Sequence, residues 1–528
     1  MSSEHKSKLS LTALILMIFT SVYGFANMPK AFYLMGYSAI PWYIISALAF
    51  SIPYAFMMAE YGAAFRKERG GIYSWMAKSV GNKYAFIVTF MWYSSNLIWL
   101  VSNSSSIWIP FSNVIYGKDT TGTWSLLGLS VPQTMAVLGS ILIIVITYAS
   151  SKGLKSITKV TSIGGTVVAL SNIVLILGAI IVFVSNGFKP AEVINGSAFV
   201  HAQNPSYQSP IGVLGFLVFA VFAYGGLEAV SGLVDETKDA KKNFPKGLMI
   251  ASIIIAVGYA VGILCVGLFT NWQEVLSGDN VNLANVAYIV IQNLGVKLGQ
   301  AFGMSTNASL QLGAWFARYI GLSMMLALMG AFFTLSYAPI KQLIEGTPKE
   351  IWPKKWTVLN ENNMPVNAMW VQCIVVVIFI LVASFGGESA NKFFSYLILM
   401  GNVAMTIPYM FLSGAFPAFK KKKHIEKPFV MYKSYKLSLI WSIIVTFTIG
   451  FANLLAKSNA TGISFEISGS SSSIIPQIPV TAKSCFFIKE MSCSLSLKSA
   501  KTPSSYFPNT LSPSTMSTCV TAVFPSST

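Results

Sequence analysis

The sequence predicts an all-α, polytopic membrane protein whose first and sixth spans are broken. Of its 528 residues, 54% are hydrophobic and only 10% are charged, and the mean hydropathy is +0.62. Soluble proteins carry about a quarter charged residues. This composition therefore excludes a soluble domain, a disordered chain and a disulfide scaffold. The other two observations are a series of long apolar segments and an uneven distribution of lysine and arginine between them.

Eleven segments are long and apolar enough to cross a bilayer, since a spanning helix needs about 20 mostly apolar residues. The first of them follows Lys6 and Lys8 but has no small-residue cleavage site, so we expect a retained anchor and not a signal peptide. The predicted spans are 10–36, 39–65, 84–112, 131–151, 161–185, 211–234, 247–270, 314–343, 365–384, 391–417 and 433–456.

The basic residues orient these spans. Of the 36 lysines and arginines, 25 fall in the N-terminal tail and in alternate loops, and only six lie on the opposite side or within spans. The positive-inside rule then predicts a cytoplasmic N-terminus in a multi-pass protein of the plasma membrane, embedded in the lipid bilayer. The net charge of +18 reports this topology, which argues against a nucleic-acid partner.

The chain divides into a membrane domain and a tail. The domain covers 1–456; if spans one to five and six to ten are repeats, the core repeats are about 9–185 and 211–417, followed by an extra span at 433–456. The tail, 457–528, is rich in serine and proline, and no window in it reaches a membrane span. Two interpretations remain open: a disordered segment, or a shifted reading frame in place of a final helix.

The first and sixth spans contain helix-breaking residues at mid-depth. Gly24 and Pro29 interrupt the first, and the Gly225–Gly226 pair interrupts the sixth. Proline removes a backbone donor and paired glycines weaken a helix. Freed backbone groups at bilayer depth are tolerated only where they are buried in protein or line a cavity. Breaks at corresponding positions of two halves indicate a transporter binding site.

Such breaks suit a zwitterion. Free N–H groups at a half-helix N-terminus attract a carboxylate, and free carbonyls at a C-terminus attract an ammonium group, so we expect a small-molecule amino acid substrate. Trp92 and Trp315 are further aromatic candidates for walls or gates. The predicted substrate-binding residues are those of the two breaks, Tyr23, Gly24, Phe25, Ala26, Asn27, Phe222, Tyr224, Gly225, Gly226 and Leu227.

Glu228 is the one acidic residue deep within a span, and intramembrane ionisable residues are functional candidates. It either fixes the geometry of the broken helix or is a protonatable group beside the binding site. Lys30, beyond the first break, is a candidate partner for an acidic substrate side chain. Glu60 and Arg318 lie nearer span ends, where we expect them to snorkel to the interface.

The residue types and their spacing do not support an enzymatic function. The three histidines lie in the tail or loops, and the five cysteines show no metal-ligand spacing. Without an HExxH, GxSxG or P-loop motif we expect no catalytic residue, no metal and no cofactor. Rings of charge or a filter loop, which a channel would show, are not evident either.

Several separated motifs resemble those of the amino acid–polyamine–organocation (APC) superfamily. The segment from Phe222 to Glu228, with Asn243–Gly247 after it, resembles the sixth-span signature of that superfamily. Ala59–Gly62 and Gly70–Trp75 are similar to its second-span motif. Ser21–Tyr23 and Pro29 resemble the glutamate/GABA antiporter branch, and most of all its YjeM-type members.

The resemblance implies a LeuT-like fold of two inverted five-helix repeats, usually followed by two more helices. It implies an amino acid antiporter working by alternating access, with Glu228 at the position of a proton-sensing or gating glutamate. A homodimer is possible in this family, but the twelfth helix is missing here. The fifth span also has no lysine at mid-depth. A proton- or sodium-coupled symporter of amino acids or polyamines is the alternative, with candidate sodium oxygens on Thr20, Ser21, Thr334 and Ser336.

Overall fold

A computed structural model describes residues 9–68, 71–228, 231, 234, 237–362, 364–386 and 405–461. Within these residues the secondary structure is helical, apart from one isolated bridge between Leu9 and Thr237. The predicted tail lies outside the described residues from 462 onward, as does 391–404 of the predicted tenth span.

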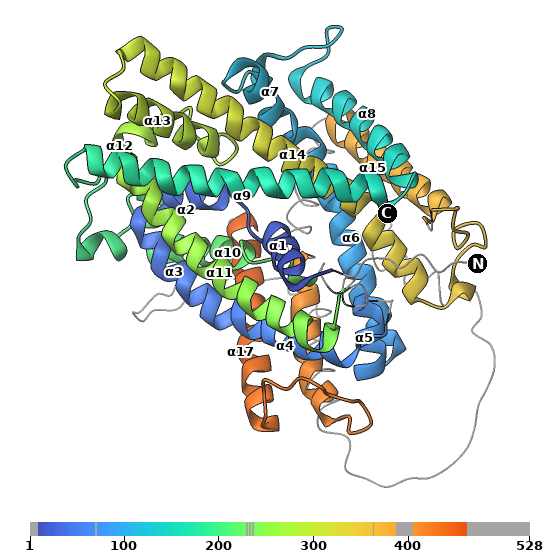
Figure 1. Cartoon of the computed structure of the whole chain (residues 1–528). Helices are drawn as coiled ribbons and strands as arrows, with labels where there is room; N and C mark the ends of the chain where they lie inside the picture. Colours follow the sequence, from blue (N-terminus) through green and yellow to red (C-terminus); the bar gives the residue numbers. More distant parts are fainter. Residues whose placement is uncertain are drawn as a thin grey trace, which may run out of the picture. The chain divides into compact units, whose positions relative to one another are not determined.

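Figure 1 shows the helices coloured in chain order. The first half holds α1 Leu11–Val22, α2 Asn27–Met35, α3 Ala39–Ser46, α4 Ile52–Ala64, α5 Gly71–Ser79, α6 Asn82–Ser106, α7 Trp108–Tyr116, α8 Val131–Ser151 and α9 Leu154–Ser185. The second half holds α10 Pro210–Phe222, α11 Ala240–Phe269, α12 Trp272–Val275, α13 Val286–Ala301, α14 Thr306–Gly346, α15 Val366–Phe385, a helix at 405–421 and α17 Tyr435–Thr461.

The helical fold predicted from the sequence is confirmed. Among the described residues, 8 helical runs are long and apolar enough to cross a membrane, and they correspond to the predicted spans two to five, seven to nine and eleven. The first predicted span is divided between α1 and α2, and the sixth is helical only to Phe222 before its break. The tenth is described from 405 onward.

The buried apolar side chains form two separate clusters. One joins α1 to α4 with α10, α11 and much of α9 and α13. The other joins the second half of α6 with α8, α14 and α15. Figure 1 shows α11 beside α4 in the first group and α15 beside α8 in the second. The two broken helices belong to the first cluster, so a movement of that cluster against the second would carry the breaks with it.

Glu60, near the end of α4, is fully buried and does not snorkel to the interface, so the prediction for this residue was wrong. Lys420 Nζ lies 2.7 Å from its Oε2 atom, at the end of helix 405–421. Its Oε1 atom accepts hydrogen bonds from the N–H groups of Met431 (2.8 Å) and Tyr432 (2.7 Å). The segment after 421 folds back over the end of α4 and supplies donors for both oxygens. The carboxylate therefore has no need to reach water.

Replacing Lys420 with methionine should destabilise the protein strongly, because it leaves the Glu60 carboxylate buried without its cation. Breaking a buried ion pair costs about 3–5 kcal/mol. Thermal unfolding in detergent measures the effect. The control is Glu426→Gln, which removes a pair to Arg66 whose glutamate side chain is 65% exposed, and it should leave the midpoint nearly unchanged. Equal midpoints for the two variants would contradict this assignment.

Candidate functional site

The first break lies between α1 and α2 and leaves backbone groups free. The α1 helix ends at Val22 and α2 begins at Asn27. Among the described residues, the N–H groups of Phe25 and Ala26 have no acceptor and the Tyr23 carbonyl has no donor. The break therefore presents two free donors at the start of one half-helix and a free acceptor beyond the end of the other.

The second break follows α10. Two turn bonds continue past the helix, from Tyr224 N–H to the Val221 carbonyl (3.2 Å) and from Gly225 N–H to the Phe222 carbonyl (3.0 Å). At Gly226 the backbone takes a φ of +115°, in the region that favours glycine. The second half of this span is described only in part, at 231, 234 and from 237.

Tyr259 of α11 joins the two breaks through its hydroxyl group. The oxygen accepts hydrogen bonds from Gly24 N–H (2.9 Å) and from the Asn27 side-chain amide (3.1 Å). The hydroxyl donates to the Ala223 carbonyl at 2.9 Å, and the Val22 carbonyl lies 3.2 Å away. One side chain thus satisfies backbone groups of both broken helices, which suits a bilayer interior where water cannot do so.

Aromatic rings fill the space around this hydroxyl. Tyr23 stacks on Tyr259 with ring centroids 4.6 Å apart, and Tyr224 meets Tyr259 edge-on at 5.3 Å. Tyr43 of α3 lies 5.1 Å from Tyr259 and accepts a hydrogen bond from the Tyr224 hydroxyl at its own carbonyl (3.1 Å). The predicted aromatic walls at Tyr23 and Tyr224 thus pack on a tyrosine that no motif pointed to.

Glu228 lies beside the second break and is buried. Its Oε2 atom accepts a hydrogen bond from Gly226 N–H (3.2 Å), and the side chains of Tyr409 and Trp92 also hydrogen bond to the carboxylate. The Tyr409 hydroxyl, from helix 405–421, accepts from Gly226 N–H as well (2.8 Å). These contacts favour the interpretation in which Glu228 fixes the geometry of the broken helix, and they leave its protonation role as a prediction.

The other predicted residues lie as follows. Phe25, Ala26 and Leu227 are buried in the breaks, Phe222 is half-buried, and Gly225 lies under the Tyr409 hydroxyl. Trp315 does not belong to the site, because its side chain is 67% exposed on α14, where it lies over Arg318. Tyrosines in apolar spans were the available signal for Tyr259 and Tyr409, since a buried hydroxyl needs a partner. That signal does not identify the group to which each tyrosine hydroxyl hydrogen bonds.

Lys30 is half-buried in the first turn of α2, and no carboxylate of the described residues lies within ion-pair distance of it. Of the candidate sodium oxygens, the Thr334 hydroxyl donates to the Gly330 carbonyl in its own helix (2.9 Å). The Ser336 hydroxyl is buried without a partner among the described residues. The side chains of Thr20 and Ser21 lie outside the described residues.

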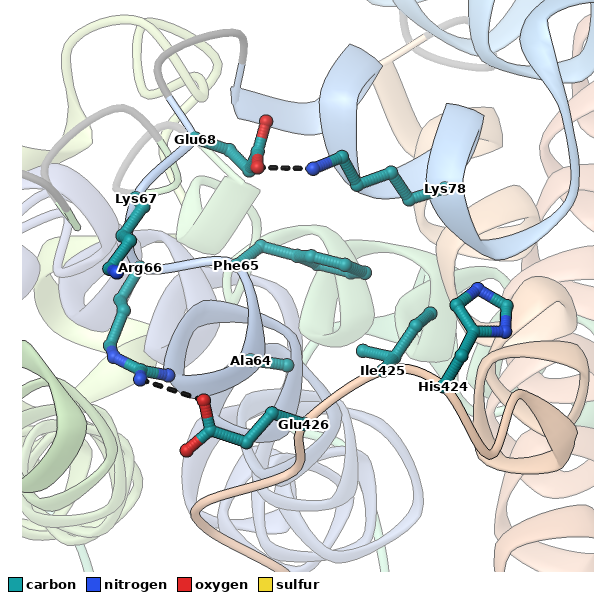
Figure 2. Close-up of a pocket in the computed structure, with 9 residues that line it drawn as sticks. All are labelled: Ala64, Phe65, Arg66, Lys67, Glu68, Lys78, His424, Ile425 and Glu426. Atoms are coloured by element: carbon teal, nitrogen blue, oxygen red, sulfur yellow. Dashed lines mark hydrogen bonds and ion pairs between the residues drawn. The ribbon is translucent and has the colours of Figure 1, made fainter.

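A separate cavity of about 420 Å³ lies at the cytoplasmic end of α4. Figure 2 shows two ion pairs in its wall, Arg66 with Glu426 (2.9 Å) and Lys78 with Glu68. The Arg66 guanidinium lowers the pKa of the Glu426 carboxyl, so this pair persists as the pH falls through the ordinary pKa of glutamate, about 4.3. No residue of the two breaks lines this cavity, and no sequence motif predicted it. Its walls are Ala64, Phe65, Arg66, Lys67, Glu68, Lys78, His424, Ile425 and Glu426.

Comparison with known proteins places this geometry in a family. A family model described as amino acid permease matches residues 9–475. The inner membrane transporter YjeM of Escherichia coli (strain K12) is 52% identical over 447 residues, which cover 85% of this chain and 89% of that protein.

Two more distant relatives carry names that state substrates. The aspartate/glutamate permease AcaP of Lactococcus lactis subsp. cremoris is 25% identical, over 81% of this chain and 84% of its own length. A glutamate/gamma-aminobutyrate antiporter of Lactococcus lactis subsp. lactis is 23% identical, over 73% of this chain and 71% of its own length.

A solved structure confirms the predicted fold. The crystal structure of MhsT in complex with L-phenylalanine aligns with a TM-score of 0.51 at 14% identity, covering 85% of this chain and 98% of that chain. MhsT has the LeuT fold, so the likeness shows the fold of this chain.

Replacing Tyr259 with phenylalanine should lower the thermal stability, because it leaves Gly24 N–H and the Ala223 carbonyl without their shared partner. An unsatisfied buried polar group costs about 1–3 kcal/mol. Tyr23→Phe is the matched control, since among the described residues the Tyr23 hydroxyl hydrogen bonds only to the Met28 sulfur (2.9 Å), a weak acceptor. Thermal unfolding in detergent should show a clear loss for the first variant and a small one for the second. The reverse order would refute the bridging role of Tyr259.

Proposed function

The chain belongs to the amino acid permease family of membrane transporters, and we propose that it carries an amino acid across the plasma membrane by alternating access. The observation that carries this proposal is the set of free backbone groups in the first break, the N–H groups of Phe25 and Ala26 and the Tyr23 carbonyl. Buried polar groups in proteins are normally hydrogen-bonded. Groups left free inside a bilayer protein are available to a ligand.

The arrangement fits the two charges of an amino acid. The free N–H groups lie at the start of α2, where the helix dipole is positive, so a substrate carboxylate binds favourably there. The Tyr23 carbonyl, at the end of α1, accepts from a substrate ammonium group. The Ala223 carbonyl would become a second acceptor if Tyr259 moved aside. A polyamine, which has no carboxylate, would leave the N–H groups unused.

We further propose that the substrate has an acidic side chain and that transport is an exchange of glutamate/GABA-like amino acids. Lys30 lies one turn beyond Ala26 on α2 and has no carboxylate partner among the described residues. An unpaired ammonium group near the substrate favours an acidic ligand. The names of the two Lactococcus relatives, which mention aspartate, glutamate and gamma-aminobutyrate, support the same substrate class.

The second candidate is symport coupled to protons or sodium. Ser336 supports it, because its buried hydroxyl has no partner among the described residues and could bind a cation. Thr334 weakens it, because its hydroxyl already donates to the Gly330 carbonyl. One hydroxyl does not make a sodium site, which needs several oxygen ligands, and the relative named as a glutamate/gamma-aminobutyrate antiporter supports exchange.

Counterflow in proteoliposomes tests the main proposal. Vesicles loaded with glutamate or GABA should take up the same labelled amino acid against its gradient, and empty vesicles should not; glutamine and arginine are tested in the same way. An imposed proton or sodium gradient should not replace the internal amino acid. If the folded and inserted protein exchanged none of the four, the main proposal would be lost. Uptake driven by an ion gradient alone would establish symport.

Glu228→Gln, measured in the same assay, separates the two interpretations of that carboxylate. The glutamine can still accept a hydrogen bond from Gly226 N–H, so the broken helix should keep its geometry. If Glu228 senses protons, exchange by the variant loses its pH dependence. Tyr409→Phe is the comparison, because it keeps the carboxylate and removes one of its hydrogen-bond partners, so exchange should stay pH dependent with a displaced profile. An unchanged pH profile in Glu228→Gln would dismiss proton sensing and leave the structural role.

Replacing Lys30 with glutamine should weaken glutamate more than GABA or glutamine. The loss of one charged hydrogen bond to a substrate carboxylate is worth about 1.5–3 kcal/mol, so we expect the KM for glutamate to rise about tenfold or more. The KM for GABA and glutamine should stay nearly constant. Lys189→Gln removes the same charge from an exposed loop and controls for the general field of the protein. Equal rises for all three substrates would exclude a specific contact.

A further inference from the structure

Two polar side chains with buried, unpartnered oxygen atoms meet the first turn of α5. Ser231 Oγ and Gln342 Oε1 have no hydrogen-bond partner among the described residues. A β-carbon built on Gly71, the first residue of α5, would lie 2.8 Å from Gln342 Oε1 and 3.2 Å from Ser231 Oγ. Three parts of the chain therefore converge at this point: α5, Ser231 and α14.

Gly71 allows this convergence. Its φ of +50° lies in the left-handed region, and it has no side chain to keep the two oxygens away from the backbone. The first N–H groups of a helix are not used by the helix itself and carry its positive partial charge. The α5 helix has nine residues, so it offers a full first turn of such donors. Donors and acceptors thus lie together in a small volume.

The convergence lies between the broken helices and the cytoplasm. Ser231 follows Glu228 by three residues, on the side of the second break away from α10. Gln342 is near the end of α14, close to Gly346, and the loops before α5 and after α14 belong to the basic, cytoplasmic set. Glu68 and Lys78, which precede and end this stretch, also line the cytoplasmic cavity of Figure 2.

Stability alone does not account for these side chains. Ser231 is only 1% exposed, and an unpaired buried hydroxyl costs free energy that an alanine would avoid. The same holds for the Gln342 amide oxygen. Buried polar groups without partners in a native structure therefore call for an explanation such as a ligand. Here the partners on offer, helix N–H groups, a hydroxyl and an amide oxygen, match a molecule that has both an anionic and a cationic end.

We propose that the first turn of α5, Ser231 and Gln342 form a release site that holds the amino acid on its way from the breaks to the cytoplasm. The site opens when α5, Ser231 and α14 separate. The α5 N–H groups and the Ser231 hydroxyl then bind the substrate carboxylate, and Gln342 Oε1 accepts from its ammonium group. This inference rests on the proposed transport function and adds a second binding position to it.

Cysteine accessibility tests the release site. Ser231→Cys and Gln342→Cys are introduced singly into the full chain with its five native cysteines replaced by alanine. In inside-out membrane vesicles, a membrane-impermeant maleimide should label both. The twenty standard amino acids and GABA are then added one at a time. An amino acid that binds at this site, present at about ten times its Kd, should slow labelling about tenfold. Ser309→Cys is the control, a buried and unpartnered serine at the opposite end of α14, and it should stay unlabelled.

Absence of labelling at Ser231→Cys and Gln342→Cys, or labelling that no amino acid slows, would overturn the release site. Counterflow with the cysteine-free chain separates failure of the release site from failure of the transport proposal. If that chain still exchanges amino acids but no amino acid slows the labelling, only the release site is overturned. A second measurement uses Ser231→Ala and Gln342→Leu. The KM measured from the cytoplasmic face should rise several-fold in both variants, and the KM from the outer face should not change. Equal changes on the two faces would indicate a structural role and contradict the proposal.

Discussion

The structure depends on one constraint: a helix that breaks inside a bilayer must find partners for the backbone groups that the break sets free. The Tyr259 hydroxyl meets that need for Gly24 and Ala223, and the Tyr409 hydroxyl meets it for Gly226. Both tyrosines come from helices outside the broken spans. The breaks are therefore stable only in the packed protein.

The same constraint links binding to movement. The free groups at Phe25, Ala26 and Tyr23 lie next to the groups that Tyr259 already occupies. An amino acid bound there extends the hydrogen-bond network that joins the two broken helices, and so it favours the conformations in which they stay together. Both breaks belong to one hydrophobic cluster, while α8, α15 and the second half of α14 belong to another. The contact between Glu60 and Lys420 fixes the end of α4 to helix 405–421 within the first cluster.

The sequence could predict the features that depend on residues close together along the chain. Apolar length and the positions of lysine and arginine predict the spans, and Gly24, Gly225 and Gly226 predict the breaks. The partners of Tyr259, Tyr409 and Glu60 could not be predicted, because each lies far away in the sequence and no periodicity marks it. The position of Glu60 near a span end predicted that it lies at the interface. In the structure the segment after 421 covers it and donates hydrogen bonds to it, so it is buried. Trp315 likewise lies on a face that its position in a span does not reveal.

The most direct test of the central claim is a structure of the protein at saturating concentration of an amino acid that it exchanges. The account predicts that the substrate carboxylate lies within hydrogen-bonding distance of the N–H groups of Phe25 and Ala26. The ammonium group should lie at the Tyr23 carbonyl. A substrate bound elsewhere, with those three backbone groups still free, would contradict the claim that the breaks form the binding site.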